Sequence, residues 1–327
     1  MKKIIYLLVL TILVLYILLF PEAAVKAAGG GLVLWYTKML PTLLPFAILS
    51  HIFVTTGILH SITRVLHRIL YPVFPVNQAC VYPLLAGFLF GFPLGSRITA
   101  QLVSEGRMDD RDGIMLFSIC NNISPVFISG YILTAALLRP DLSGITLLIL
   151  YLPPLAYYAI AIRIAARRDT ITFRTASPTK EADASPSVSK TSPSGSKASQ
   201  PGSSISFSVI DAAILNGFET LTKIGGYIML FAIFSQMISL IPFPTALPAC
   251  LLTGLIEITN GISTISQSPL SFRTKYILII LCTAFGGLSG LAQTASMTKE
   301  ARFPMWPYLK TKLICTLAST MLAFLLT

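Results

Sequence analysis

Two short polar strings interrupt apolar stretches in the first half of the chain, and two weaker copies follow in the second half. The first pair is Gly91-Phe92-Pro93-Leu94-Gly95-Ser96-Arg97 and Cys120-Asn121-Asn122-Ile123-Ser124-Pro125. The second pair is Glu257-Ile258-Thr259-Asn260-Gly261 and Phe285-Gly286-Gly287-Leu288-Ser289-Gly290. Gly/Pro breaks at corresponding places in two halves of a membrane protein are typical of a transport site. The pattern therefore favours a transporter.

The first string has the composition of a hairpin tip. Pro93 removes a backbone donor, and Gly91 and Gly95 permit sharp changes of backbone direction. We interpret the string as a tip whose N–H groups, together with Arg97, meet an anionic ligand. The alternative is a plain helix kink, with Arg97 reaching lipid head groups.

The second string places two adjacent carboxamides, Asn121 and Asn122, in an apolar run. Each amide is costly there unless its donors and acceptor are matched, and Ser124 and Pro125 loosen the helix just beyond. We expect Asn121, Asn122 and Ser124 to coordinate substrate or an ion. Hydrogen bonding between helices is the alternative, because Asn also serves that purpose in membranes.

Glu257 is the most isolated acid of the chain, in a strongly apolar setting beside Asn260 and Gly261. Such a carboxylate faces a cavity, pairs with a cation or stays protonated, so we assign it to proton or sodium coupling, with Asn260 and Gly261 in the binding set. A structural ion pair with Arg97 or Lys223 is the alternative. Glu219 and Lys223, four residues apart, are instead expected to pair with each other.

The last string presents small residues that either expose backbone to a ligand or permit close helix contact. The candidate binding residues here are Gly286, Gly287, Ser289 and Gln293. The histidines form no cluster with cysteine or carboxylate, so no metal site and no cofactor is expected. The sequence also has no nucleophile elbow, phosphate loop or metalloprotease motif, so we expect no enzymatic activity.

Composition places the chain in a bilayer. Of 327 residues, 54% are hydrophobic and 11% are charged, which is too little charge for a soluble surface. The net charge of +11 lies in short connections and one linker, as the positive-inside rule predicts, and not on a nucleic-acid-binding face. The five cysteines are widely spaced and are expected to be buried thiols.

Nine apolar segments predict an all-α polytopic membrane protein with about seven full spans and two hairpins. We divide the chain into an N-terminal membrane segment (1–28), a first membrane repeat (29–168), a flexible Ser/Pro/Lys-rich cytoplasmic linker (169–206) and a second repeat (207–327). The first segment is read as an uncleaved span, with a cleavable signal peptide as the alternative.

The distribution of positive charge predicts the topology. A linker that begins with Arg163, Arg167 and Arg168 belongs inside, so one apolar segment per half must enter and leave on the same side. The segments 79–103 and 246–266 are the candidates for such re-entrant hairpins. With them the two halves run in opposite directions, which makes an inverted-topology repeat with broken helices.

These strings resemble the sporulation integral membrane proteins of the YlbJ-like, stage V type, which carry nucleoside-recognition or Gate domains. The resemblance rests on the first-half strings with their context and on Gly254–Gly261 and Phe285–Gln293, and it spans about residues 31–324. It implies a protein of an endospore-forming bacterium, in the mother-cell-derived outer forespore membrane, that moves dipicolinic acid toward the forespore. Ser124 departs from the Gly expected after the Asn pair.

The leading hypothesis is therefore a permease for a small anionic metabolite, dipicolinate foremost, coupled to a proton or sodium ion. Arg97, backbone N–H groups and the Asn121–Asn122 amides are chemically suited to such a dianion. A non-transporting scaffold for spore-envelope assembly and a nucleoside or purine transporter are the alternatives. The lipid bilayer is the expected surrounding, no nucleic acid is expected as a partner, and a homo-oligomer is left open.

Overall fold

The computed structural model describes residues 2–56, 58–72, 74, 76–167 and 206–326, and these residues form helices and connections without strands. Four helical segments are long and apolar enough to cross a membrane: Pro140–Ile164, Phe207–Ser239, Phe272–Met297 and Met305–Leu326. A bent pair, Leu7–Leu19 with Pro21–Met39, provides a fifth. The described part of the chain has the all-helical architecture of a polytopic integral membrane protein, and the predicted linker lies outside the described residues.

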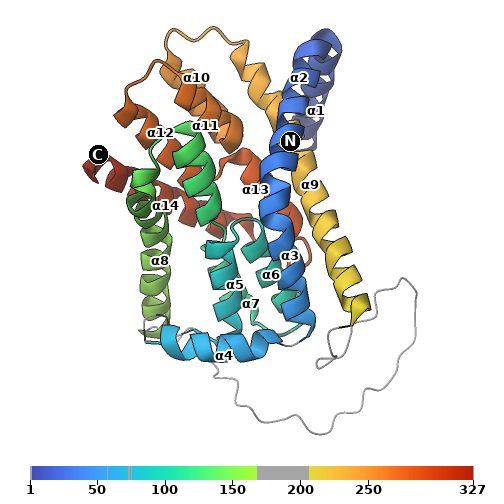
Figure 1. Cartoon of the computed structure of the whole chain (residues 1–327), viewed down its shortest axis with the longest axis vertical. Coiled ribbons are helices and arrows are strands. Elements are labelled where there is room, and N and C mark those ends of the chain that lie inside the picture. Colours follow the sequence, from blue (N-terminus) through green and yellow to red (C-terminus); the bar gives the residue numbers. More distant parts are fainter. Residues whose placement is uncertain (1, 57, 73, 75, 168–205, 327) are drawn as a thin grey trace.

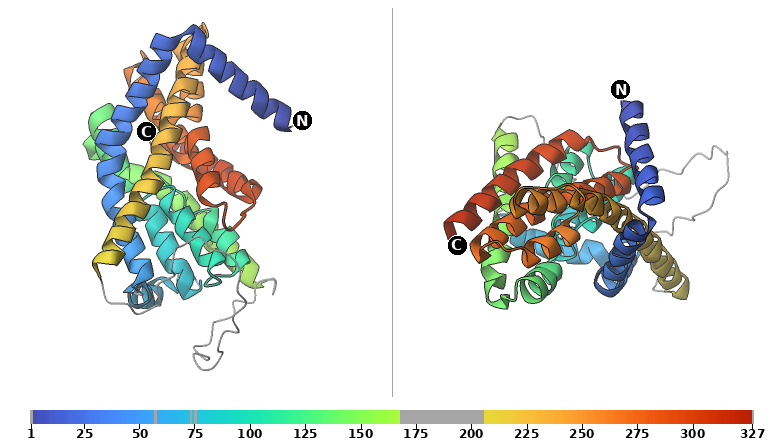
Figure 2. Two further views of the ribbon diagram at one scale, coloured as in Figure 1. Left: turned by 90° about the vertical axis from the view of Figure 1, so that its right-hand side faces the viewer. Right: turned by 90° about the horizontal axis from the view of Figure 1, so that it is seen from above.

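The N-terminal helices form an arm along one side of the molecule. Helix α1 (Lys2–Leu19) meets α2 (Pro21–Leu34) at a bend of 109° and extends away from the bundle (Figure 2). Pro21 opens α2, because proline is tolerated in the first turn of a helix. Helix α2 continues through a π-helical turn, η1 (Trp35–Met39), into α3 (Leu40–Thr55). The boundary drawn at residues 28 and 29 therefore falls inside a helix.

Each half contains, in order, a long helix, a helix pair, an interrupted segment and a last helix, and the first half has two further elements. In the first half, α3 is followed by an amphipathic helix α4 (Ile58–Leu70), the pair α5 (Gln78–Leu89) and α6 (Leu94–Ser104), the interrupted segment α7 (Asp110–Phe117) and η2 (Phe127–Ala136), the short turn η3 (Pro140–Leu142) and α8 (Ser143–Arg167). In the second half, α9 (Phe207–Ser239) is followed by the pair α10 (Ala246–Ile256) and α11 (Ile258–Gln267), the interrupted segment α12 (Phe272–Phe285) and α13 (Gly287–Met297), and α14 (Met305–Leu326).

The two helix pairs occupy opposite ends of the molecule. In Figure 1, α5 and α6 lie toward the end where α4 runs crosswise, whereas α10 and α11 lie toward the other end. The long helices α3 and α9 pack against each other and run in opposite directions (Figures 1 and 2). The end that carries α4 also carries the α6–α7 connection and the two helix ends that flank the linker (Figure 1).

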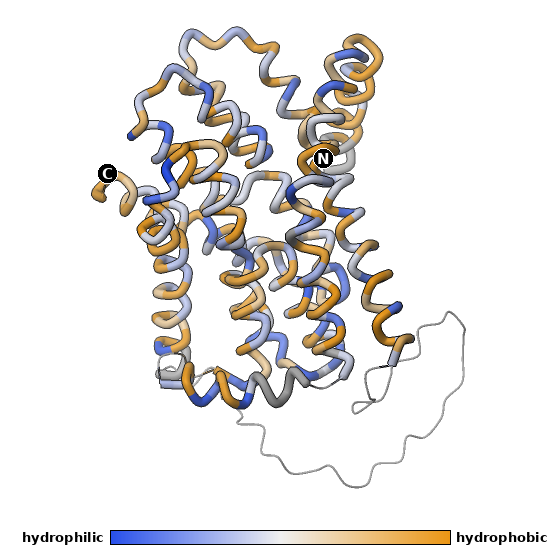
Figure 3. Tube along the Cα trace, viewed as in Figure 1, coloured by the Kyte–Doolittle hydropathy of each residue, from blue (hydrophilic) through white to orange (hydrophobic). Residues whose placement is uncertain are grey.

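Apolar surface covers the outer helices. Figure 3 shows apolar residues along α1 and α3, whereas α4 alternates between polar and apolar residues. Side chains such as Leu7, Leu317 and Phe324 are more than half exposed, which is expected where lipid is the solvent. Helix α4 is amphipathic, the type that lies at a membrane interface.

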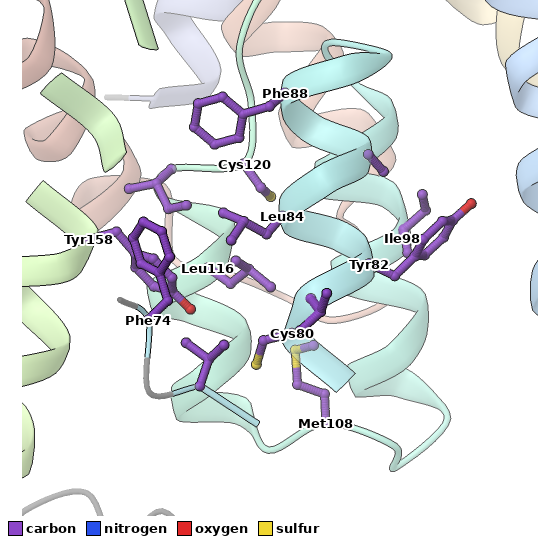
Figure 4. Packing of buried hydrophobic residues seen from close by; sticks show 14 of the residues in the cluster. Phe74, Cys80, Tyr82, Leu84, Phe88, Ile98, Met108, Leu116, Cys120 and Tyr158 are labelled. Carbon is purple, nitrogen blue, oxygen red and sulfur yellow. The ribbon is translucent and has the colours of Figure 1, made fainter. Parts of the chain in front are cut away.

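The interior of the first half is packed around α5. A cluster of buried residues that includes Leu84, Leu116, Cys120 and Tyr158 fills the space between α5, α6, α7 and α8 (Figure 4). The five cysteines are free and buried, as predicted. This packing holds the end of α5 and the stretch after α7 in fixed positions.

Candidate functional site

The four interrupted strings meet around one cavity, which we call the hairpin cavity. Its empty volume is about 580 Å³, part of it open to the outside. The first half contributes Gly91 and Phe92 from the α5–α6 tip and Ser124 and Phe127 from the second interruption. The second half contributes Glu257, Ile258, Thr259, Ser289, Gly290 and Gln293. The remaining wall is apolar. It consists of Leu43 of α3, Ile224 and Ile228 of α9, Met39 of η1, and Phe90 and Ile123 beside the first two interruptions.

Helix N-termini surround this cavity. Helices α6, η2, α11 and α13 each begin within three residues of a lining residue. The first turn of a helix carries N–H groups without an intrahelical acceptor, and the helix dipole adds roughly half a positive charge there. Four such ends at one cavity make it favourable for negative charge.

Glu257 already occupies one of these ends. It is 1% exposed and caps α11: Oε1 accepts from the Thr259 N–H (3.1 Å) and Oε2 from the Asn260 N–H (2.8 Å). The Thr259 hydroxyl also donates to Oε2. No lysine or arginine among the described residues lies within 4.0 Å of the Glu257 carboxylate. The alternative of an ion pair with Arg97 or Lys223 is therefore not found, and Lys223 pairs with Glu219 at 2.7 Å as expected.

The two asparagines have different neighbours. Asn121 is 2% exposed, and its Nδ2 donates to Thr294 Oγ1 and to Tyr308 Oη, both at 2.6 Å, so it links the first interruption to α13 and α14. The Asn122 backbone oxygen accepts from the Phe92 N–H at 2.6 Å, while its side chain faces a second cavity. Asn121 thus makes hydrogen bonds between helices, which was the alternative to coordination of substrate or an ion.

Several predicted residues shape the backbone and do not line the hairpin cavity. Gly95 packs against Gly87, Gly261 packs against Gly254, and Gly287 lies close to the backbone of Ile256 and Ile258. Pro93 precedes α6, Asn260 donates its N–H to Glu257, and Gly286 has a positive φ of 86° that ends α12. Of the predicted binding set, Gly91, Ser124, Ser289 and Gln293 line the hairpin cavity together with Glu257.

Arg97 lies away from both cavities. Its guanidinium donates to Asn216 Oδ1 at 2.8 Å and to the Thr220 hydroxyl, both on α9. The side chain therefore fastens the first helix pair to the first long helix of the second half.

We expect a double-mutant cycle of Arg97→Met and Asn216→Ala to give a coupling free energy of about 0.5–1.5 kcal/mol for unfolding, because a partly buried hydrogen bond is removed. The measurement is denaturant unfolding of the purified protein. The exposed Glu219–Lys223 pair is the matched control and should couple by less than about 0.5 kcal/mol. Equal coupling in the two cycles would contradict a fastening role for Arg97.

A second cavity, which we call the lysine cavity, borders the same interruptions. Its polar lining residues are Ser118, Asn122, Tyr151, Thr283, Lys312 and Ser319. The two cavities share Ile123 in their walls. Lys312 is 7% exposed, whereas Lys310 of the same helix is exposed.

Comparison with known proteins supports the family resemblance. The chain is 26% identical over 311 residues to the sporulation integral membrane protein YlbJ of Bacillus subtilis (strain 168). The matched region covers 90% of this chain and 75% of the relative. The resemblance to the YlbJ-like proteins is thereby confirmed. No family model matches the chain, and no solved structure matches it. The relative's name describes an integral membrane protein of sporulation. The apolar helices described above agree with a location in a membrane.

The structure adds residues that the sequence did not single out. Phe90, Phe92 and Phe127 bring aromatic rings to the hairpin cavity, and Leu43, Ile224 and Ile228 close it from the long helices. The spacing of Lys310 and Lys312 was a signal that one of them is buried. The two lie two residues apart on α14 and cannot share one face of a helix. The apolar wall residues carry no comparable signal.

Proposed function

We propose that this chain is a membrane transporter for a small anionic metabolite and that the hairpin cavity receives the substrate. The observation that carries the proposal is the meeting of all four interrupted strings, two from each half, at one cavity. Irregular backbone within a membrane has to be sheltered by protein or line a cavity. A scaffold has no need of four interruptions at one place.

The proposal includes an inverted repeat. The long helices α3 and α9, each followed by a helix pair, run in opposite directions (Figure 1). In each pair the two helices touch at glycines, Gly87 with Gly95 and Gly254 with Gly261. Opposed repeats around a central cavity can expose it alternately to the two sides of the membrane.

Dipicolinate suits the chemistry of the hairpin cavity. The N-termini of α6, η2 and α13, which Glu257 does not cap, favour its carboxylates. The rings of Phe90, Phe92 and Phe127 offer surfaces to its flat aromatic ring. This cargo, and movement from the mother cell across the outer forespore membrane, follow from the family resemblance stated above. The aromatic lining also suits a nucleoside, which is the second candidate cargo.

Glu257 gives the proposed transport a coupling step. A carboxylate and a dianionic substrate in one cavity repel each other. We therefore propose that Glu257 takes up a proton or a sodium ion together with the substrate and releases it with the substrate.

The test is uptake of radiolabelled dipicolinate by proteoliposomes that contain the purified protein. We expect uptake above that of protein-free vesicles, saturable by unlabelled dipicolinate. Uptake of uridine without dipicolinate would overturn the cargo, and uptake of neither, with correctly inserted protein, would favour the scaffold alternative.

A matched pair of variants tests the cavity itself. Gln293 and Gln267 each donate to a serine four residues earlier, at 3.0 Å and 2.8 Å, but Gln293 lines the hairpin cavity and Gln267 is exposed. We expect Gln293→Leu to lower dipicolinate uptake by roughly tenfold, which corresponds to the loss of a buried hydrogen bond to a charged ligand. Gln267→Leu should change uptake by less than about twofold. Equal effects would place the substrate elsewhere.

A further inference from the structure

The lysine cavity collects C-terminal helix ends, whereas the hairpin cavity collects N-terminal ones. Ser118 and Ile119 follow α7, and Thr283 and Ala284 lie in the last turn of α12. The C-terminal end of a helix carries roughly half a negative charge and carbonyl groups without intrahelical donors. In broken membrane helices such ends favour cations.

The polar atoms of the lysine cavity are also arranged for a cation. The Thr283 hydroxyl is buried, with Thr283 2% exposed, and has no hydrogen-bond partner among the described residues. The Nδ2 of Asn122 donates to the Ile119 carbonyl at 2.8 Å, so Asn122 offers its Oδ1 as an acceptor. These side chains, which come from the two interruptions, surround one space.

Lys312 supplies the positive charge in this space. Its Nζ donates to the Ala284 carbonyl at 3.4 Å, a long hydrogen bond, while an ammonium has three donors. Within the described residues no carboxylate lies within 4.0 Å of Nζ. Because a buried lysine within a membrane is costly, its charge needs compensation, and the helix ends provide it.

We propose that the lysine cavity is a site for a monovalent cation and that the protein fills it with its own Lys312 ammonium, so that no sodium ion is needed there. The interruptions then carry a cation at their C-terminal helix ends and the anionic substrate at their N-terminal ends. The importance of this arrangement for transport rests on the proposed function, whereas cation occupancy of the cavity does not.

The experiment measures the melting temperature of the purified protein in chloride salts of sodium, methylammonium and choline at constant ionic strength. Lys312→Ala leaves an empty cation site, so we expect sodium or methylammonium to raise its melting temperature by several degrees, while the larger choline does not. The wild type, Lys312→Met, which fills the space without charge, and Lys310→Ala, which removes an exposed charge from the same helix, should not respond. Equal responses of Lys312→Ala and the wild type would overturn the proposal and leave Lys312 as a cap of α12.

A second pair of variants keeps the proposal testable if Lys312→Ala does not fold. Thr283→Asp adds a carboxylate to the lysine cavity. If the cavity holds a cation, the new carboxylate should pair with the Lys312 ammonium and be tolerated. We expect Thr283→Asp and Thr283→Asn to accumulate equally in the membrane. Loss of the aspartate variant alone would overturn the proposal. These measurements need no substrate, so uptake of neither dipicolinate nor uridine would refute the proposed function and leave the cation site standing.

Discussion

Replacing Glu257 by alanine is expected to lower the free energy of unfolding by about 2–3 kcal/mol and to abolish ion-driven uptake of dipicolinate. The stability loss follows from the three hydrogen bonds that the carboxylate accepts at the start of α11. The transport loss follows from the proposed coupling, since no other acidic residue lines the hairpin cavity among the described residues.

Glutamine at the same position separates the two roles. Its single amide oxygen can replace only part of the carboxylate's capping, so Glu257→Gln should lose about 1 kcal/mol of stability. A neutral amide cannot bind and release a proton or hold a sodium ion as a carboxylate does. We therefore expect Glu257→Gln to exchange labelled for unlabelled dipicolinate across the vesicle membrane but to accumulate none against a gradient.

Thr259→Val is the control for Glu257. It removes the hydroxyl that donates to Oε2 and leaves both backbone hydrogen bonds of the cap in place. Its uptake should stay ion-driven, with a small loss of stability. If Glu257→Gln accumulates dipicolinate as well as the wild type does, Glu257 is a helix cap only, and the coupling residue lies elsewhere.

The positions of the interruptions could be predicted from sequence because glycine and proline act locally. The predicted break at Gly91–Gly95 separates α5 from α6, and the break at Glu257 separates α10 from α11. The first follows from Gly91 (φ 83°) and Pro93, and the second from the side chain of Glu257, which caps α11 through the Thr259 and Asn260 N–H groups. Neighbouring residues suffice to fix such features.

The direction of individual side chains could not be predicted in the same way. Asn121 and Asn122 lie in irregular backbone after α7, where neighbouring side chains need not share a face. One contacts α13 and α14, and the other lines the lysine cavity. Arg97 bonds to α9, more than a hundred residues away in sequence. These partners depend on tertiary packing, which a local pattern does not contain.

Replacing Gly87 by alanine is expected to destabilise the first half more than any surface substitution, by at least about 4 kcal/mol. A Cβ on Gly87 would lie 1.9 Å from the carbonyl oxygen of Cys120, and one on Gly95 would lie 2.2 Å from the same atom. This oxygen belongs to the backbone beside the second interruption, so it cannot move away without displacing Asn121 and Asn122. Protein abundance in the membrane and unfolding of the purified variant measure the effect.

The corresponding position of the second half offers a sharper version of the test. A Cβ on Gly254 would lie 2.4 Å from the Sγ of Cys282 and 3.2 Å from its Cβ, so the closest atom belongs to a side chain. Cys282→Ala removes that atom and should partly rescue Gly254→Ala, whereas Cys120→Ala leaves the carbonyl in place and should not rescue Gly87→Ala. Gly226→Ala, with no atom within 4 Å of the added Cβ, should be neutral or slightly stabilising. In the structure an added Cβ meets backbone at Gly87 and a side chain at Gly254. Rescue of both variants, or of neither, would contradict this geometry.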